Sequence, residues 1–217
     1  TREAGVIFHC DAAQSLGILP IDVQALSVDL LSLSAHKRYG PKGVGAVYIR
    51  KGTPLIRFLH GGSHERNRRA GTHNVPGIVG LGEAIRLALE VMDDEAARLR
   101  ALRDRMIAGL LALDGVRLNG HPTERLPGNV NVSFRSADSE SLLLALDLQG
   151  VAASSGSACT SGSLEPSHVL SAIGLDPEIA AGTLRFSLGR WTTDEEIDYV
   201  LQILPGVVEQ VRSAFVS

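Results

Sequence analysis

The chain has 217 residues, 44% of them apolar, and a formal net charge of −3 at pH 7. These values fit one large domain or two small ones, and they exclude a disordered chain or a small disulfide scaffold. They give no general reason to expect nucleic acid or an anionic membrane as a partner, although four arginines cluster between residues 57 and 69.

Three strands are expected in the first part of the chain. Apolar, β-branched runs predict them over residues 6–10, 28–34 and 43–50. The crossover between the first two strands favours a parallel pair. Residues 59–74 are polar and rich in glycine and arginine, and an ordered loop of this length is usually functional.

Helical periodicity follows from Pro76 to Leu110, where apolar residues recur at steps of three and four. The pattern predicts either one long bent helix or two consecutive helices. Beyond these helices we expect strands over 116–118 and 129–134, a helix from Asp138 to Gln149 and a short strand over 151–153. A loop of small residues over 154–163, a short helix over 166–174 and a strand over 183–188 should follow. The last helix should start with a capping box at 192–196 and break or kink at Pro205.

The start of the chain and its cysteines bear on location. The two cysteines, Cys10 and Cys159, lie far apart in the sequence, so we expect a reducing, cytoplasmic compartment and no disulfide framework. No apolar run approaches the length that crosses a bilayer, and no basic-then-apolar leader begins the chain, so we expect a soluble protein. The apolar residues Val6–Phe8 follow almost directly on Thr1, without an initiator methionine, as in a chain entered partway through a fold.

Polar side chains follow two neighbouring apolar strands at the point where each strand ends. Asp11 ends the first, and His36 and Lys37 end the second before a Gly/Pro loop begins. In open α/β sheets ligands gather beyond the carboxyl ends of strands, so a lysine at this point is placed to react. A lysine and a carboxylate are two parts of a pyridoxal phosphate site, because the lysine forms a Schiff base with the cofactor and the acid keeps the ring nitrogen protonated.

Three further polar residues could complete such a site. Gln14 could bond the ring hydroxyl, and Ser34 and His36 would share one face of their strand by alternating along it, as phosphate donors would. Each residue also has an ordinary interpretation: Asp11 as a helix N-cap, Gln14 as a surface residue, Ser34 as a turn residue and His36 as a core histidine. Together, these interpretations leave unexplained why polar groups end two neighbouring strands.

Five motifs, collinear along the chain, resemble those of the cysteine desulfurases of the NifS/IscS type, which are fold-type I pyridoxal phosphate enzymes of the class V aminotransferase group. The motifs are His9–Ser15, Ser34–Gly43, Gly61–Arg66 together with Arg69–Thr72, Ser154–Ser161 and Leu184–Arg190. The resemblance implies an α/β fold. Residues 1–90 would be the C-terminal half of the large domain, with a mostly parallel sheet and a linking helix, and residues 91–217 a smaller α+β domain that carries the cysteine loop.

The resemblance also assigns roles to individual residues. The cofactor would be held by Lys37 as a Schiff base, by Asp11 at the pyridine nitrogen, by Gln14 at the ring hydroxyl, and at the phosphate by Ser34, His36 and a partner subunit's copy of Thr72. A residue supplied by a partner implies a homodimer. Arg185 would bind the substrate carboxylate, a task that suits a planar guanidinium; the alternative is a strand arginine that pairs with a surface acid.

Cys159 decides which reaction the resemblance implies. It lies in the loop of small residues, where an exposed thiol is a liability unless it is used. Within the family, such a cysteine takes sulfur from L-cysteine as a persulfide, L-alanine is released, and the sulfur passes to an acceptor or iron–sulfur scaffold protein. Cys10, on an apolar strand, is expected to be a small buried hydrophobe.

Some features depart from the family. Its long N-terminal portion has no counterpart here, so we expect this chain alone to bind the cofactor poorly and to be nearly inactive unless another chain completes the fold. His73 stands where many relatives have an acid. Two other classes stay open, a related pyridoxal phosphate enzyme such as an aminotransferase or selenocysteine lyase, and a non-catalytic scaffold-binding module. A zinc site at His60, His64 and His73 lacks a cysteine or carboxylate to complete it.

Overall fold

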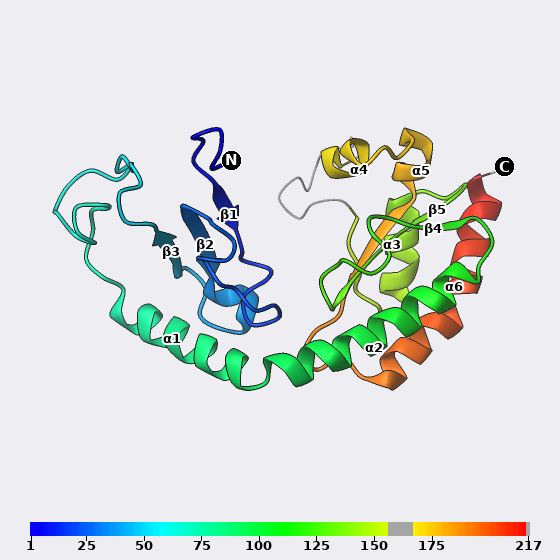
Figure 1. The fold of residues 1–217 in the computed structure, drawn as a ribbon. Helices are drawn as coiled ribbons and strands as arrows, with labels where there is room; N and C mark the ends of the chain where they lie inside the picture. Colours follow the sequence, from blue (N-terminus) through cyan, green and yellow to red (C-terminus); the bar gives the residue numbers. More distant parts are fainter. Residues whose placement is uncertain (156–166, 216–217) are drawn as a thin grey trace. The chain divides into compact units, whose positions relative to one another are not determined.

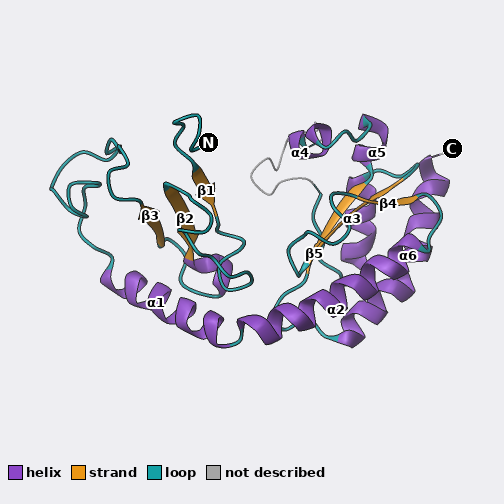
Figure 2. Ribbon diagram, viewed as in Figure 1, coloured by secondary structure: helices purple, strands orange, loops and turns teal. Residues whose placement is uncertain are grey.

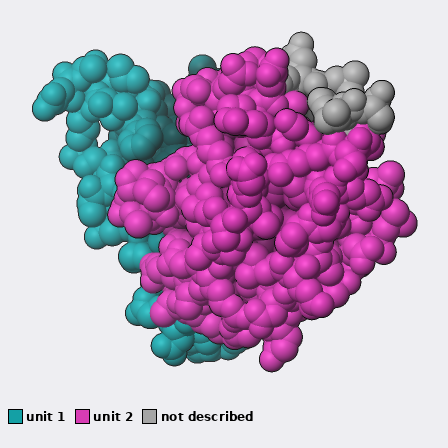
Figure 3. All heavy atoms as spheres, turned by 90° about the vertical axis from the view of Figure 1, so that its right-hand side faces the viewer, with its two compact units in different colours: residues 1–94 teal, residues 95–217 magenta. Residues whose placement is uncertain are grey.

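A computed structural model describes residues 1–155 and 167–215 of the chain (Figure 1). It divides into two compact units, residues 1–94 and residues 95–217 (Figure 3). In its described residues each unit combines a three-stranded sheet with helices (Figure 2). None of the helices in these ranges is both long and apolar enough to span a bilayer.

The first unit has a sheet with the strand order β1-β2-β3. Its elements are β1 (His9–Asp11), β2 (Leu30–Ser34), the 3-10 helix η1 (Ala35–Arg38), β3 (Gly45–Ile49) and α1 (Val75–Glu90). β1 and β2 are parallel, as the crossover predicts, and β3 returns antiparallel to β2. β1 is shorter than predicted because only its last residues pair with β2, while Val6 and Ile7 stay exposed.

A small apolar cluster supports this sheet. Ala12, Val28 and Leu31 are 1–3% exposed, and partly buried side chains of all three strands pack around them. Cys10 is one of these partly buried residues and carries a free thiol. This environment is that of a small hydrophobe, as expected from the apolar strand around it.

The periodic segment forms two consecutive helices, α1 and α2 (Met92–Leu111). Val91 separates them, with φ −115° and ψ 6°. α1 begins at a clear N-cap: the side-chain oxygen of Asn74 accepts a hydrogen bond from the Gly77 backbone N–H at 3.2 Å, and Pro76 occupies the first turn. The structure therefore selects the second of the two predicted arrangements.

The second unit contains most of α2 and an antiparallel sheet with the order β4-β5-β6. Its other described elements are β4 (Val116–Leu118), β5 (Asn129–Phe134), α3 (Ser139–Leu148), α4 (His168–Ala172), α5 (Pro177–Ala181), β6 (Thr183–Ser187) and α6 (Asp194–Phe215). The bounds of β4 and β5 are those predicted from the sequence. Residues 151–153 form no strand, which corrects that prediction, and Ser154 alone makes an isolated bridge, with Arg185.

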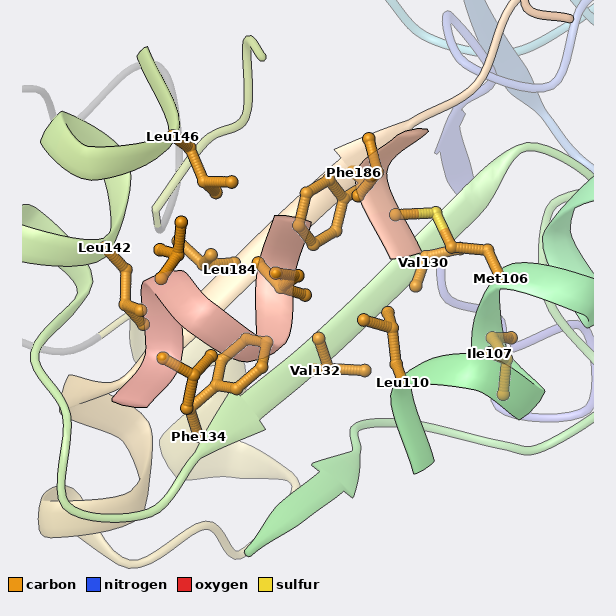
Figure 4. Close-up of a cluster of buried hydrophobic side chains, with 14 of the residues drawn as sticks. Met106, Ile107, Leu110, Val130, Val132, Phe134, Leu142, Leu146, Leu184 and Phe186 are labelled. Atoms are coloured by element: carbon orange, nitrogen blue, oxygen red, sulfur yellow. The ribbon is translucent and has the colours of Figure 1, made fainter. Parts of the chain in front are cut away.

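The core of the second unit lies on one face of its sheet (Figure 4). Val130, Val132 and Phe134 alternate along β5 and are completely buried. They pack with buried residues of α2, α3, β6 and α6, among them Met106, Leu110, Leu142, Leu146, Leu184 and Leu204. This alternation is the period-two pattern that predicted the strand.

Capping side chains start α3 and α6. Asp138 accepts a hydrogen bond from the Ser141 backbone N–H at 2.8 Å at the start of α3. At the start of α6, Thr193 N–H donates to Glu196 Oε2 at 3.0 Å and Glu196 N–H to Thr193 Oγ1 at 3.3 Å, the predicted capping box. Pro205 lies inside α6 and does not end it, so of the predicted break or kink the break is wrong. Buried apolar residues on both sides of the proline hold the helix against the core.

Candidate active site

Asp11 lies at the carboxyl end of β1, opposite Ser32 of β2. Because these strands are parallel, their carboxyl ends meet at one edge of the sheet, and the acid lies at the same edge as the residues that follow β2. Its side chain is exposed, and Oδ1 accepts a hydrogen bond from the Ala13 backbone N–H at 2.9 Å. Turns follow, so Asp11 orients a turn and is not a helix N-cap.

Ser34 and His36 come together, but for a different reason than predicted. Ser34 is the last residue of β2, whereas His36 belongs to the 3-10 helix η1, so the two do not alternate along a strand. The tight turn of η1 instead folds the imidazole back, and Ser34 Oγ lies 2.9 Å from His36 Nδ1. A hydroxyl and an imidazole thus form one hydrogen-bonded pair at the sheet edge, and His36 is exposed, unlike a core histidine.

Lys37 is an exposed residue of η1, next to this pair. The backbone of η1 is held in place, because Ala35 is completely buried and its carbonyl accepts a hydrogen bond from the Gly40 N–H at 3.0 Å. Tyr39 closes the helix in the left-handed region, with φ 59° and ψ 15°. Lys37 is therefore carried by a short ordered turn, while its own side chain can reach a ligand.

The turns after β1 carry Gln14, whose side chain is exposed. The Ser15 N–H donates to the Ala12 carbonyl at 3.0 Å, which keeps this segment next to β1. His9 and Ser32 are neighbours that the sequence analysis missed: His9 Nε2 lies 2.7 Å from Ser32 Oγ, across the β1–β2 pair. The sequence signal for this contact was a polar residue within each of the two short strands, His9 in β1 and Ser32 in β2.

The loop over residues 59–74 carries Thr72 as an exposed residue, and the Thr72 carbonyl lies 3.5 Å from Arg69 Nη2. His73 Nε2 lies 3.3 Å from a Glu65 carboxylate oxygen, and the His73 ring meets that of His64 edge-on at a centroid distance of 5.3 Å. In the part of the chain that the structure describes, no group of three or more His, Cys, Asp or Glu residues could hold a metal ion.

Arg185 belongs to the second unit, on β6, opposite Asn131 of β5. Two backbone hydrogen bonds join it to Ser154, from Ser154 N–H to the Arg185 carbonyl at 3.1 Å and from Arg185 N–H to the Ser154 carbonyl at 2.7 Å. The segment predicted to carry the reactive cysteine therefore begins beside Arg185. Cys159 itself lies outside the described residues.

A buried polar network lies on the face of the sheet that carries Asn131. The Asn119 side-chain N–H₂ donates to Asn131 Oδ1 and to Ser133 Oγ, each at 2.8 Å, and Ser133 Oγ lies 2.6 Å from Thr183 Oγ1. Asn119, Ser133 and Thr183 are at most 4% exposed. In an antiparallel pair, directly opposite residues share a face, so this network adjoins the strand position of Arg185.

Comparison with known proteins gives a consistent result. A model of the family "Aminotransferase class-V" matches residues 1–200. A cysteine desulfurase IscS of Methanosarcina thermophila is 55% identical over 212 residues, which cover 98% of this chain and 52% of that protein. The chain spans about half the length of the relatives it matches.

Two solved structures extend the comparison. A NifS-like protein is 38% identical, with a TM-score of 0.84, over 94% of this chain and 53% of that one. SspA in complex with cysteine is 35% identical, with a TM-score of 0.67, over 88% of this chain and 53% of that one. The family match over residues 1–200 includes the sheet edge that carries Lys37 and the strand that carries Arg185.

Proposed function

The chain belongs to the class V aminotransferase family, and we propose that it carries the lysine-bearing and cysteine-bearing part of a pyridoxal phosphate-dependent cysteine desulfurase. The substrate would be L-cysteine, and the products L-alanine and a persulfide on Cys159. One observation carries the proposal above the others: an acid, an amine and a hydroxyl–imidazole pair lie at the carboxyl edge of one pair of parallel strands. That the related SspA was solved with cysteine bound supports the choice of substrate.

The residues at this edge fit the cofactor. Pyridoxal phosphate needs an amine for its aldehyde, an acceptor at its ring nitrogen and donors at its phosphate. Lys37 would supply the amine and Asp11 the acceptor. Ser34 and His36, already paired at 2.9 Å, would supply phosphate donors, with Gln14 at the ring hydroxyl. When bound, the cofactor supplies an electron sink that acidifies the Cα–H of the substrate.

The chain's own residues would perform the remaining tasks. Arg185 would bind the substrate carboxylate through its planar guanidinium and so fix which bond faces the cofactor. The Lys37 amine would move the proton at Cα, because an amine beside that carbon is correctly placed for the transfer. Cys159 would accept the sulfur as its thiolate: a sulfur–sulfur bond forms, the carbon–sulfur bond of the substrate breaks, and the carbon takes a proton to give L-alanine.

Two kinds of protein partner belong to the proposal. A homodimer would let Thr72 reach the phosphate of the opposite subunit. Side chains near that loop suit a protein contact, because Ile56 and Phe58 are 92% and 91% exposed. A sulfur acceptor or iron–sulfur scaffold protein would take the persulfide sulfur, and we place the reaction in the cytoplasm.

The cofactor site can be tested on the chain as it is, because the sequence has only three lysines, Lys37, Lys42 and Lys51. The chain is incubated with pyridoxal phosphate and reduced with borohydride, which fixes any lysine–pyridoxal linkage as a stable amine, and mass spectrometry then locates the label. The chain alone is expected to bind the cofactor weakly, but we expect the label that it takes up to lie mainly on Lys37, with less of it there in Asp11→Asn and no change in the control Lys42→Arg. Equal labelling of all three lysines would contradict the proposed site.

The reaction requires a complete enzyme, so this chain is joined to the part of the Methanosarcina thermophila relative that lies outside the match. Alanine and sulfide are measured from L-cysteine in the presence of a thiol reductant. We expect Cys159→Ser to abolish sulfide release while pyridoxal phosphate still labels Lys37. The control Cys10→Ser should keep both the sulfide release and the labelling of Lys37. Sulfide release that survives Cys159→Ser would refute the assigned nucleophile.

A further inference from the structure

Arg38, the residue after Lys37, is buried although it carries a charge. It is the last residue of η1 and only 7% exposed, and its Nε donates a hydrogen bond to the carbonyl oxygen of Leu16. Burying a guanidinium is costly unless it is hydrogen bonded. An apolar residue would fill such a position at less cost, so the contact that the arginine makes needs an explanation.

The partner carbonyl belongs to the segment that follows Asp11. Leu16 lies in the turns after β1, where its N–H donates to the Ala12 carbonyl at 3.1 Å and the Leu19 N–H donates to the Ser15 carbonyl at 3.0 Å. Gln14 is part of the same run of turns, and Asp11 is the last residue of β1, just before it. Arg38 therefore joins the segment that carries the acid to the helix that carries the amine, across 22 positions of sequence.

Both joined segments rest on one face of α1. A Cβ added at Gly17 would lie 2.6 Å from the Cβ of Ala88, and one added at Gly40 would lie 3.0 Å from the Cβ of Ala84. Ala84 and Ala88 are one helical turn apart and both buried. The backbones on either side of the Arg38 contact are thus packed too closely on α1 to accept side chains, and Arg38 fixes how they lie relative to each other on this surface.

We propose that Arg38 is a positioning residue, which holds the Asp11–Gln14 segment at a fixed separation from Lys37. The inference rests on the proposed cofactor site, since it gives the fixed separation a purpose: one ligand must meet the carboxylate and the amine at once. Arg38 itself would touch neither cofactor nor substrate. Its effect would reach them through the Leu16 carbonyl on one side and the η1 backbone on the other.

Arg50 offers a matched control in the same unit. Its Nε and Nη2 donate to the Val28 carbonyl at 3.0 Å and 2.7 Å, so it too ties a guanidinium to the backbone of a preceding segment. Val28 precedes β2, whereas Lys37 follows it, so the two clamps lie at opposite ends of that strand. Arg50 Nε also pairs with Asp29 Oδ1 at 3.2 Å, so Arg50→Leu removes both contacts at the other end of β2. We expect this variant to lower stability without acting on the segments beside Lys37.

The experiment compares Arg38→Leu, Arg38→Lys and Arg50→Leu in the whole chain. Hydrogen exchange followed by mass spectrometry measures the protection of residues 12–19, and borohydride reduction with pyridoxal phosphate measures the share of label on Lys37. In Arg38→Leu we expect exchange of residues 12–19 to rise about tenfold or more, as for a lost hydrogen bond to a charged donor, and the Lys37 share to fall toward that of Lys42 and Lys51. Arg38→Lys, which keeps a donor, should recover part of both.

Several outcomes separate the possibilities. If Arg50→Leu lowers the Lys37 share as much as Arg38→Leu does, the role of Arg38 is merely structural and the proposal fails. Unchanged exchange of residues 12–19 in both Arg38 variants overturns it as well. Should Arg38→Leu not fold, Arg38→Lys decides alone, and wild-type exchange and labelling in that variant refute the proposal. Equal labelling of the three lysines in the unaltered chain would refute the proposed cofactor site instead. In that case hydrogen exchange of residues 12–19 would still show whether Arg38 holds that segment in place.

Discussion

The buried hydroxyl pair of Ser133 and Thr183 allows a quantitative prediction. Ser133 Oγ contacts Thr183 Oγ1 at 2.6 Å and also accepts from Asn119 at 2.8 Å, and neither hydroxyl residue is more than 3% exposed. Ser133→Ala leaves two buried partners without this contact and should cost about 1–3 kcal/mol. Thr183→Val keeps the side-chain shape and leaves Ser133 bonded to Asn119, so it should cost about 1 kcal/mol. The double variant should cost less than the sum, with a coupling of about 1 kcal/mol, because no hydroxyl is then left unsatisfied.

The assay is urea unfolding of the whole chain, followed by far-UV circular dichroism and by the fluorescence of Trp191, the only tryptophan, which belongs to the second unit. Ser187→Ala, an exposed position on β6, is the control and should change the free energy of unfolding by less than about 0.5 kcal/mol. Single costs that add within about 0.3 kcal/mol, or a Ser133→Ala cost below that of Thr183→Val, would refute the reasoning.

Three further predictions concern the second unit. Burial is the largest single influence on Asp138 and opposes its ionisation, but the hydrogen bonds that the carboxylate accepts from the backbone and side chain of Ser141 and from nearby backbone N–H groups together outweigh it and hold the pKa of Asp138 below its ordinary value. The stabilisation from Asp138 is therefore present above the unfolded pKa of about 4 and is lost as pH falls through the lower folded pKa. Asp138→Ala should cost about 1 kcal/mol at pH 7, and unfolding at a series of pH values should show the difference vanishing in acid. Gly182→Ala should destabilise the unit by more than about 2 kcal/mol in urea, because the new Cβ would clash with the Phe134 carbonyl, and a near-neutral result would contradict that packing. Pro205→Ala should raise the melting temperature, because it restores a helical N–H inside α6 and removes a ring clash; a lower value would mean that the proline is needed there.

The fold was predictable where a pattern recurs within one element. Asn129–Phe134 alternates between apolar and polar residues, and the structure gives β5 those bounds because one face packs on the core while the other carries the polar network. α5 was missed although its signal was present, an Asp176 N-cap followed by Pro177 at the first helical position. A helix of five residues has fewer than two turns, so its apolar positions do not repeat often enough for the helical period to be recognised.

The candidate site was predictable to the extent that its residues are close in sequence or joined by strand pairing. Ser34, His36 and Lys37 lie within one short segment, and the parallel pairing of β1 with β2 brings Asp11 to the same edge. The reason given for the Ser34–His36 pair was nevertheless wrong, because a strand was assumed to continue where a 3-10 helix begins. Neither the apolar pattern nor strand propensity marks the change from strand β2 to helix η1, because alanine at position 35 is compatible with both structures.

The contact that sequence could not supply is the one that holds these segments together. Arg38 reads as a solvated residue of a polar loop, because arginines are rarely buried, and its partner is a main-chain carbonyl 22 positions away, which no side-chain pattern reports. Motifs therefore identify the groups that perform the chemistry, whereas the separation between those groups depends on backbone packing against α1 at Gly17 and Gly40. Variants chosen only among the residues with a proposed chemical role would test the chemistry and leave this geometry untouched, so the comparison of Arg38 with Arg50 is the more informative experiment.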